Sequence, residues 1–266
     1  MDKVRLSFHE EIRRNKFYSG LLMVIVFGVL ILLGYVIGLV MGGDWFFIIM
    51  IAAIVISISY ILISYYNSDK IAIASVGAKK AYQDNYREYH HLVEGLCLAS
   101  GLPKPRLYVM EDNNINAFAS GRDPKHAVIC MTTGALERLD KRELEGVLSH
   151  ELSHIANFDI RFMTFAAVMV GMVAIISQIF LRSLFFRSFS GGDRDDNNAI
   201  FMIIGIALAI IAPLVVMMVQ LAISRKREFA ADSSAVKFTR TPTGLINALS
   251  KIKDNSEMKV SGAVAP

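Results

Sequence analysis

The stretch Ser149-His150-Glu151-Leu152-Ser153-His154 has the pattern H-E-x-x-H. On a helix, residues four positions apart lie one above the other on the same face, so His150 and His154 can grip one metal ion. Glu151 follows at the next position, where a carboxylate can act as a general base. Burying these groups among apolar neighbours is unfavourable unless they have a task. The motif therefore predicts a zinc hydrolase site that needs a third ligand from elsewhere in the chain.

The composition predicts a membrane protein. Hydrophobic residues make up 54% of the 266 residues, and the mean hydropathy of +0.45 is too high for an ordinary soluble protein. Four stretches lack Asp, Glu, Lys and Arg and reach the roughly 20 residues that a membrane-spanning helix needs. They cover residues 17–43, 45–68, 162–181 and 197–224. The first stretch is too long for the apolar part of a cleaved signal peptide.

The distribution of Lys and Arg predicts the orientation of these four spans. The N-terminal segment, the middle loop and the tail hold 5, 12 and 8 basic residues, whereas the two loops on the opposite side hold 0 and 3. Because basic loops stay in the cytoplasm, we expect a multi-pass protein of the cell membrane with both termini and the motif cytoplasmic. The expected parts are a cytoplasmic segment 1–16, a transmembrane hairpin 17–68, a cytoplasmic catalytic domain 69–161, a second hairpin 162–224 and a cytoplasmic tail 225–266.

The segment between the second and third spans predicts a small α+β domain. Helical spacing of apolar residues predicts a helix over 78–100, which Gly101 ends. Three β-type runs follow, at 106–110, 116–120 and 126–132, and the last two are close enough to form a hairpin. An extended peptide can bind at a sheet edge through main-chain hydrogen bonds, so either hairpin strand is a candidate substrate site. A purely structural hairpin is the alternative.

The motif helix has a clear start signal. Asp140, followed three residues later by Glu143, predicts a capping box and a helix from Lys141 to about residue 156. The adjacent pair His90-His91 points in directions about 100° apart on its own helix, so we expect a solvated face rather than a metal site. Cys97 and Cys130 lack metal-ligand spacing and are expected to be reduced core thiols.

Glu228 is the candidate third ligand. If the fourth helix continues out of the membrane, Glu228 lies roughly 6 Å beyond the apolar run, and His154 lies about 12 Å before the third span. The two can then meet at a similar height. Asp232, one turn later, can accept the second ring N–H of a zinc-bound histidine. Surface ion pairing with Arg225 or Arg227 is the alternative for either carboxylate.

The order of these features resembles the HtpX family of integral-membrane zinc metalloproteases, which is related to the endoproteases that process CAAX-type prenylated proteins. The resemblance covers nearly the whole chain and is most specific over 116–121, 150–159 and 224–232. It implies a mainly α membrane protein, with four transmembrane helices and a cytoplasmic α+β zincin-like metalloprotease domain that contains a small sheet. It also implies one Zn2+ per chain, with His150, His154 and Glu228 as ligands, Glu151 as the catalytic carboxylate, and Asn116, Ala117 and Phe118 near the bound peptide.

Members of that family cleave misfolded or damaged membrane proteins at the cytoplasmic face, so the resemblance implies such substrates and a role in membrane protein quality control under stress. Relatives continue with a further histidine-containing segment that assists substrate or oxyanion binding. This chain has no histidine after His154, so we expect the tail to be truncated or that role to be filled otherwise.

Three functions compete at this point. A membrane zinc endopeptidase uses every feature of the motif, because Glu151 supplies the base that peptide hydrolysis needs. A zinc-containing membrane scaffold or holdase that does not cleave is the alternative, and it leaves Glu151 without a task. A transporter lacks support, since none of the four spans contains Asp, Glu, Lys or Arg. The net charge of +4 and the absence of a basic stripe predict protein or peptide substrates and a lipid bilayer, but no nucleic acid, as partners.

Overall fold

The chain forms two compact units that are built from alternating segments of the sequence. The computed structural model describes residues 8–41, 45–164 and 225–262. One unit contains Met1–Lys16, Asn67–Thr164 and Ser224–Pro266, and the other contains Phe17–Tyr66 and Phe165–Ile223. The expected third and fourth spans lie outside the described residues, apart from 162–164 at the start of the third.

Within the part of the chain that the structure describes, two helices are long and apolar enough to cross a membrane. They are α1 (Phe8–Met41) and α2 (Trp45–Tyr66), whose most apolar stretches have mean hydropathies of 1.9 and 2.9. Large apolar side chains of α2 are exposed, including Phe47 at 71% and Ile51 at 64%. Exposed apolar surface of this extent on a helix with no charged residue indicates contact with lipid. The first two expected spans are therefore helical, as the sequence predicts.

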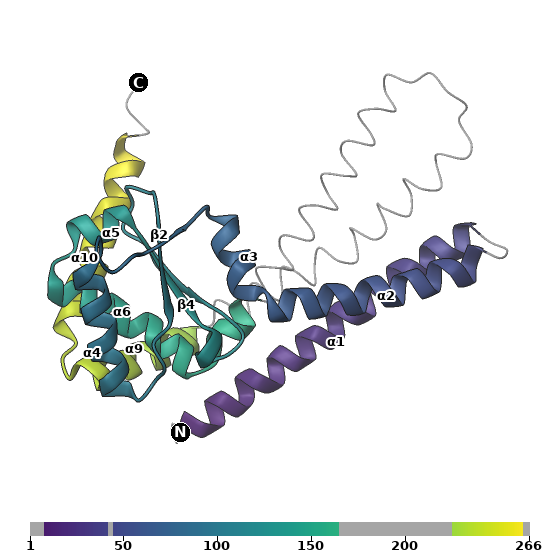
Figure 1. Cartoon of the computed structure of the whole chain (residues 1–266), viewed down its shortest axis with the longest axis horizontal. Helices are drawn as coiled ribbons and strands as arrows, with labels where there is room; N and C mark the ends of the chain where they lie inside the picture. The colour runs from purple at the N-terminus through teal and green to yellow at the C-terminus, as the bar shows by residue number, and fades with distance from the viewer. Residues whose placement is uncertain (1–7, 42–44, 165–224, 263–266) are drawn as a thin grey trace. The chain divides into compact units, whose positions relative to one another are not determined.

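The unit that includes Asn67–Thr164 contains a four-stranded mixed sheet (Figure 1). Its strands are β1 (Lys79–Lys80), β2 (Arg106–Met110), β3 (Ala117–Ser120) and β4 (Val128–Thr132), in the order β1-β2-β4-β3. Strands β2 and β4 are parallel, and the other two pairings are antiparallel. The expected hairpin of the last two strands is confirmed, with the short 3-10 helix η1 (Pro124–His126) in its connection. Strand β3 lies at an edge of the sheet.

Helices cover both faces of this sheet. All five residues of β4 are buried, and the first four alternate between two hydrophobic clusters. Val128 and Cys130 pack with Ile73 of α3 (Ser68–Ser75) on one face. Ile129 and Met131 join the larger core on the other face, where α4 and α6 lie. Cys130 is a buried free thiol, as is Cys97, in agreement with the sequence prediction.

The helix expected over 78–100 begins later than predicted. Helix α4 covers Arg87–Ser100, because Lys79 and Lys80 pair with β2 instead. A turn follows this pairing, and Tyr82 in that turn is 62% exposed rather than buried on a helical face. The predicted end is correct: Gly101 adopts φ +72°, and its N–H donates to the Cys97 carbonyl.

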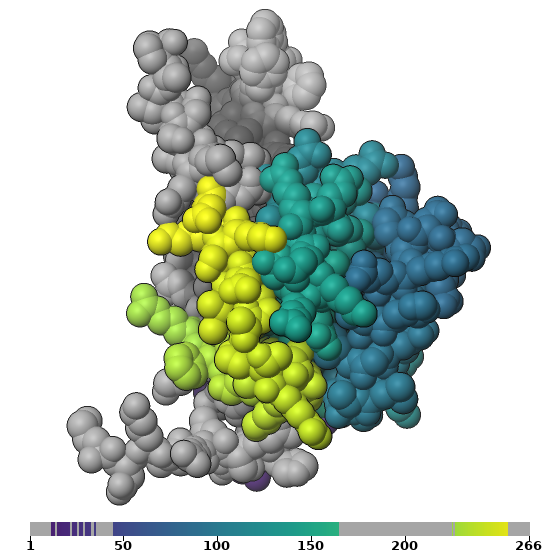
Figure 2. Space-filling view, turned by 90° about the vertical axis from the view of Figure 1, so that its left-hand side faces the viewer, coloured from purple at the N-terminus to yellow at the C-terminus, as the bar shows by residue number. Residues whose placement is uncertain are grey.

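The motif helix α6 (Lys141–Ala156) begins with the predicted capping box. The Asp140 side chain accepts hydrogen bonds from two N–H groups of the first turn, and the Glu143 carboxylate accepts from the Asp140 N–H at 2.8 Å. Lys251 of α10 (Thr243–Gly262) forms a 2.6 Å ion pair with Glu143. The short helix α5 (Thr133–Arg138) precedes α6, and α9 (Arg225–Thr239) and α10 pack against α6. In Figure 2, α10 in yellow lies against the teal surface that includes α5 and α6.

Helices α6 and α10 approach each other closely through two glycines. A Cβ on Gly146 would clash with backbone atoms of Gly244 and Leu245, and a Cβ on Gly244 would clash with the Arg142 carbonyl. Gly95 on α4, in contrast, has open space around its missing Cβ. The contact between the motif helix and α10 therefore requires glycine at these two positions.

We expect Gly146→Ala to destabilise the domain by about 1 to 3 kcal/mol, because the backbones must separate to admit the methyl group. Gly95→Ala is the matched control, and it should stabilise by about 0.5 to 1 kcal/mol through helix propensity alone. Thermal unfolding of both variants in detergent checks the prediction. Equal shifts in the same direction would contradict the close contact.

Candidate metal centre and active site

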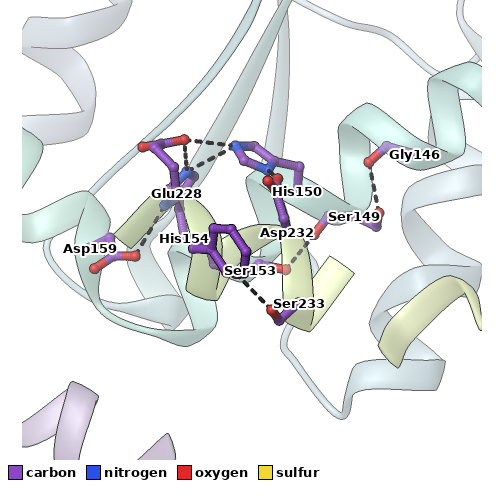
Figure 3. Close-up of polar contacts among 10 residues, drawn as sticks. Gly146, Ser149, His150, Ser153, His154, Asp159, Glu228, Asp232 and Ser233 are labelled. Carbon is purple, nitrogen blue, oxygen red and sulfur yellow. Dashed lines mark hydrogen bonds and ion pairs between the residues drawn. The ribbon is translucent and has the colours of Figure 1, made fainter. Parts of the chain in front are cut away.

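Helix α6 presents His150 and His154 side by side on one face (Figure 3). Their Nε2 atoms are 3.1 Å apart, and their ring centroids are 4.7 Å apart. His154 is buried, whereas His150 is partly accessible. This is the arrangement that the four-residue spacing of the motif predicts.

Glu228 reaches the same point from α9. Its Oε2 atom lies 3.4 Å from Nε2 of His150 and 3.8 Å from Nε2 of His154. Glu228 and His154 are 74 positions apart in the sequence, yet the three candidate ligand atoms lie within 4.8 Å of one another. The structure thus brings together the three residues that the sequence proposes as ligands.

Two further carboxylates lie within hydrogen-bond distance of the Nδ1 atoms of the two imidazoles. Asp232 Oδ1 lies 2.9 Å from Nδ1 of His150, and Asp159 Oδ2 lies 3.1 Å from Nδ1 of His154. A carboxylate accepts the Nδ1–H, so the lone pair of each histidine is on Nε2 and points toward Glu228. Asp232 lies where the sequence places it. The sequence alone does not predict this role for Asp159, because a single acidic residue after the motif helix has no spacing that links it to His154.

The donor set fits a zinc ion. Two imidazole lone pairs and one carboxylate oxygen converge, and a cation relieves their mutual repulsion. Ligand atoms about 2.0 to 2.2 Å from a tetrahedral zinc ion lie roughly 3.3 to 3.6 Å apart. The separations of 3.1, 3.4 and 3.8 Å bracket that range. Three protein ligands leave a fourth position open, as in catalytic rather than structural zinc sites.

The charges of the cluster shift its protonation equilibria. Burial alone would lower the pKa of His150, but its hydrogen bond to Glu228 and the negative charges of Glu151 and Asp232 raise it overall. The same hydrogen bond, acting against partial burial, lowers the pKa of Glu228. Glu228 is therefore an anion at neutral pH, and a proton competes with the metal for His150.

Glu151 lies beside the edge strand of the sheet. Burial raises the pKa of its carboxyl above the ordinary value, although the two histidines and the main-chain N–H of Ala119 in β3 oppose this shift. A raised pKa brings a carboxylate closer to the range in which it can both accept and return a proton. Contacts between α6 and β3 thus place the candidate base next to the sheet edge.

The residues proposed to bind a peptide lie at or just before β3. Asn116 is exposed, and its Oδ1 accepts the N–H of Ala117 at 2.9 Å. Ala117 and Phe118 are half-buried, and Phe118 packs toward the α3 face. Strand β4, the other candidate for strand addition, pairs on both sides and cannot accept another strand. Of the two candidates, only β3 has an edge that no other described strand pairs with.

The alternative partners for Glu228 receive little support. Among the described contacts, the Arg227 guanidinium lies over the Phe162 ring at 4.4 Å, and it is only a minor influence on the pKa of Glu228.

The His90-His91 pair lies outside the ligand cluster. His90 Nε2 is 2.8 Å from the Ala81 carbonyl, and His91 is exposed.

Comparison with known proteins gives one consistent family. Residues 83–261 match peptidase family M48. The chain is 47% identical to the "Protease HtpX homolog" of Thermoanaerobacter pseudethanolicus over 196 residues, which is 73% of this chain and 66% of the relative. The proteins of the same name from Caldanaerobacter subterraneus and Dictyoglomus thermophilum are 41% and 39% identical, over 91% and 94% of this chain and 80% of each relative. No solved structure matches the chain significantly.

The family match covers the H-E-x-x-H helix, the edge strand and Glu228, and the relatives extend the similarity to the two apolar helices. These proteins are metalloendopeptidases, and the apolar helices α1 and α2 identify a membrane protein. The chain therefore belongs to peptidase family M48, together with the HtpX membrane metalloproteases.

Proposed function

We propose that this protein is a multi-pass zinc endopeptidase that cleaves misfolded or damaged membrane proteins at the cytoplasmic face of the cell membrane. His150, His154 and Glu228 bind one Zn2+, and Glu151 is the general base. Asp232 fixes the orientation of His150, and the edge formed by Asn116, Ala117 and Phe118 binds the substrate. One observation carries the proposal: three converging lone pairs lie beside a half-buried carboxylate, next to a strand edge that is unpaired among the described residues.

The metal and Glu151 have different tasks in peptide hydrolysis. When bound, zinc acts as a Lewis acid that polarises a carbonyl oxygen and makes water more acidic at neutral pH. Glu151 takes the proton of the attacking water and returns it to the leaving amine. Its raised pKa suits both steps, because the proton is held neither too weakly nor too strongly. A non-cleaving scaffold would have no use for this carboxylate.

The edge of β3 supplies the orientation of the substrate. An extended peptide can add to this edge as a further strand through main-chain hydrogen bonds. The Ala119 N–H, which influences Glu151, belongs to the same strand, so a peptide bound there runs past the base. Binding through the main chain imposes little sequence preference, and this suits an enzyme that acts on unfolded segments of many proteins.

The basic residues support the cytoplasmic orientation. Under the four-span arrangement, 25 of the 28 Lys and Arg residues fall in the N-terminal segment, the catalytic domain and the tail. The positive-inside rule then assigns the catalytic domain to the cytoplasm. Membrane proteins whose cytoplasmic loops have unfolded are the substrates that such an enzyme meets first.

We expect Glu151→Gln to retain one bound zinc and to lose casein cleavage by about 10²-fold or more, since the proton acceptor is removed and the ligands stay. Zinc content and gel-based cleavage by detergent-purified protein measure the two effects. Glu145→Gln, the same substitution on the same helix away from the ligands, is the control and should cleave like the wild type. Cleavage by Glu151→Gln at the wild-type rate would refute the peptidase assignment. A wild type that binds zinc but does not cleave would favour the scaffold.

Zinc binding should weaken on acidification sooner than at an ordinary histidine site. Because the pKa of His150 is raised, its proton competes with zinc from a higher pH downward. Asp232→Asn removes one cause of that shift, so its zinc affinity should fall less steeply with decreasing pH. At pH 8 the same variant should bind zinc about 10- to 100-fold more weakly, because the imidazole is less basic and less well oriented.

Chelator competition between pH 5.5 and 8.5 gives both quantities. Asp84→Asn, a change of the same kind at an exposed position, is the control and should follow the wild type throughout. Parallel pH profiles for wild type and Asp232→Asn would contradict the contribution of Asp232 to the protonation of His150.

A further inference from the structure

The buried carboxylate of Asp159 has a second partner besides the histidine. Asn15, near the start of α1, donates from Nδ2 to Asp159 Oδ1 at 2.5 Å. The other oxygen, Oδ2, faces Nδ1 of His154 at 3.1 Å. Asp159 is fully buried, and Asn15 and His154 are each only 4% exposed. A buried carboxylate requires hydrogen-bond partners at its oxygens, and here a different residue faces each oxygen.

The same segment of α1 also contacts the turn that contains Asp159. Asn15 Nδ2 lies 3.0 Å from the Asn157 carbonyl, and the Lys16 ammonium lies 4.2 Å from the centre of the Phe158 ring. Phe158 has φ +60°, a left-handed conformation that is unfavourable for an aromatic residue. Strained residues persist where their surroundings hold them in place. The turn is therefore held from two sides, by α6 and by the start of α1.

We propose that Asn15 is a positioning residue of the metal centre. It orients the carboxylate of Asp159, which in turn orients the imidazole of His154 toward the zinc. Asn15 acts through Asp159 and the turn that carries it, not by direct contact with metal or substrate. Asn15 lies in the part of α1 that belongs to the same compact unit as the metal centre, so the start of this helix and the site share one hydrogen-bonded connection. This inference rests on the proposed zinc site.

The geometry explains why an amide is suited to this position. An amide Nδ2 carries two N–H groups, and the structure provides two acceptors for them, the Asp159 carboxylate and the Asn157 carbonyl. Leucine has a similar size and shape but no donor. It would leave one buried carboxylate oxygen without its partner, and Asp159 could then rotate away from His154.

The test compares zinc affinity and the visible absorption of the cobalt-substituted protein for wild type, Asn15→Leu and Asn15→Ala. The alanine variant removes the amide without adding volume, so it serves if leucine prevents folding. Arg13→Ala, an exposed change two residues earlier on α1, is the matched control. We expect both Asn15 variants to bind zinc about 10-fold more weakly and to alter the cobalt spectrum, because changes behind a metal ligand cost about 10- to 100-fold in affinity. Arg13→Ala should leave both readouts unchanged.

A second comparison separates positioning from a general effect on folding. In an Asp159→Ala background the side chain that links Asn15 to His154 is absent, so Asn15→Leu should weaken zinc binding by less than about 2-fold further. Wild-type affinity and an unchanged cobalt spectrum in the Asn15 variants would overturn the inference, as would an equal loss in both backgrounds. If the wild type itself bound no zinc, the proposed function would fail. A wild type that binds zinc, with Asn15 variants that match it, refutes the role of Asn15 alone.

Discussion

Electron-pair donors of His150, His154 and Glu228 converge on one point, and the rest of the structure is arranged around this convergence. Two imidazole nitrogens 3.1 Å apart, with a carboxylate oxygen beside them, repel one another unless a cation or a proton lies between them. Carboxylates behind the rings keep each lone pair on the inward-facing nitrogen, which prevents the histidines from relieving the repulsion by changing tautomer. The cluster is thus prepared for a metal before any metal arrives. In its absence, the raised pKa of His150 lets a proton take part of that role.

The surrounding fold keeps α6 in place so that this convergence is maintained. Its N-terminus is fixed by a capping box whose buried Glu143 is also paired with Lys251 of α10. Its middle packs against α10 through the glycine contact at Gly146, and its other sides meet the sheet and α9. Tight packing on several sides transmits small displacements to the site. The close approach of His150, His154 and Glu228 therefore depends on contacts far from the cluster itself.

The sheet forms part of the core, and it also places an edge strand, β3, beside the motif helix. Strand β4 is fully buried and paired on both sides, which leaves β3 as the strand beside the motif helix with a free edge. The main-chain N–H of Ala119 on that strand influences the carboxyl of Glu151, so the edge strand and the motif carboxylate lie next to each other. Burial of Glu151 raises its pKa, and the histidines and the N–H limit that rise. The protonation of Glu151 therefore depends on several neighbours at once rather than on one contact.

Local sequence patterns by themselves determined the motif helix, its cap, the three longer strands and the two apolar helices, because periodicity and capping depend on residues a few positions apart. They also selected Glu228 and Asp232, since both follow an apolar run at helical spacing. The tertiary structure alone decided that β3 is the edge, that Lys79 and Lys80 form a strand instead of a helix, and that Asp159 and Asn15 stand behind His154. Asn15 and Asp159 are 144 residues apart. Such partners are chosen by packing between distant segments, and no local pattern records which segments become neighbours.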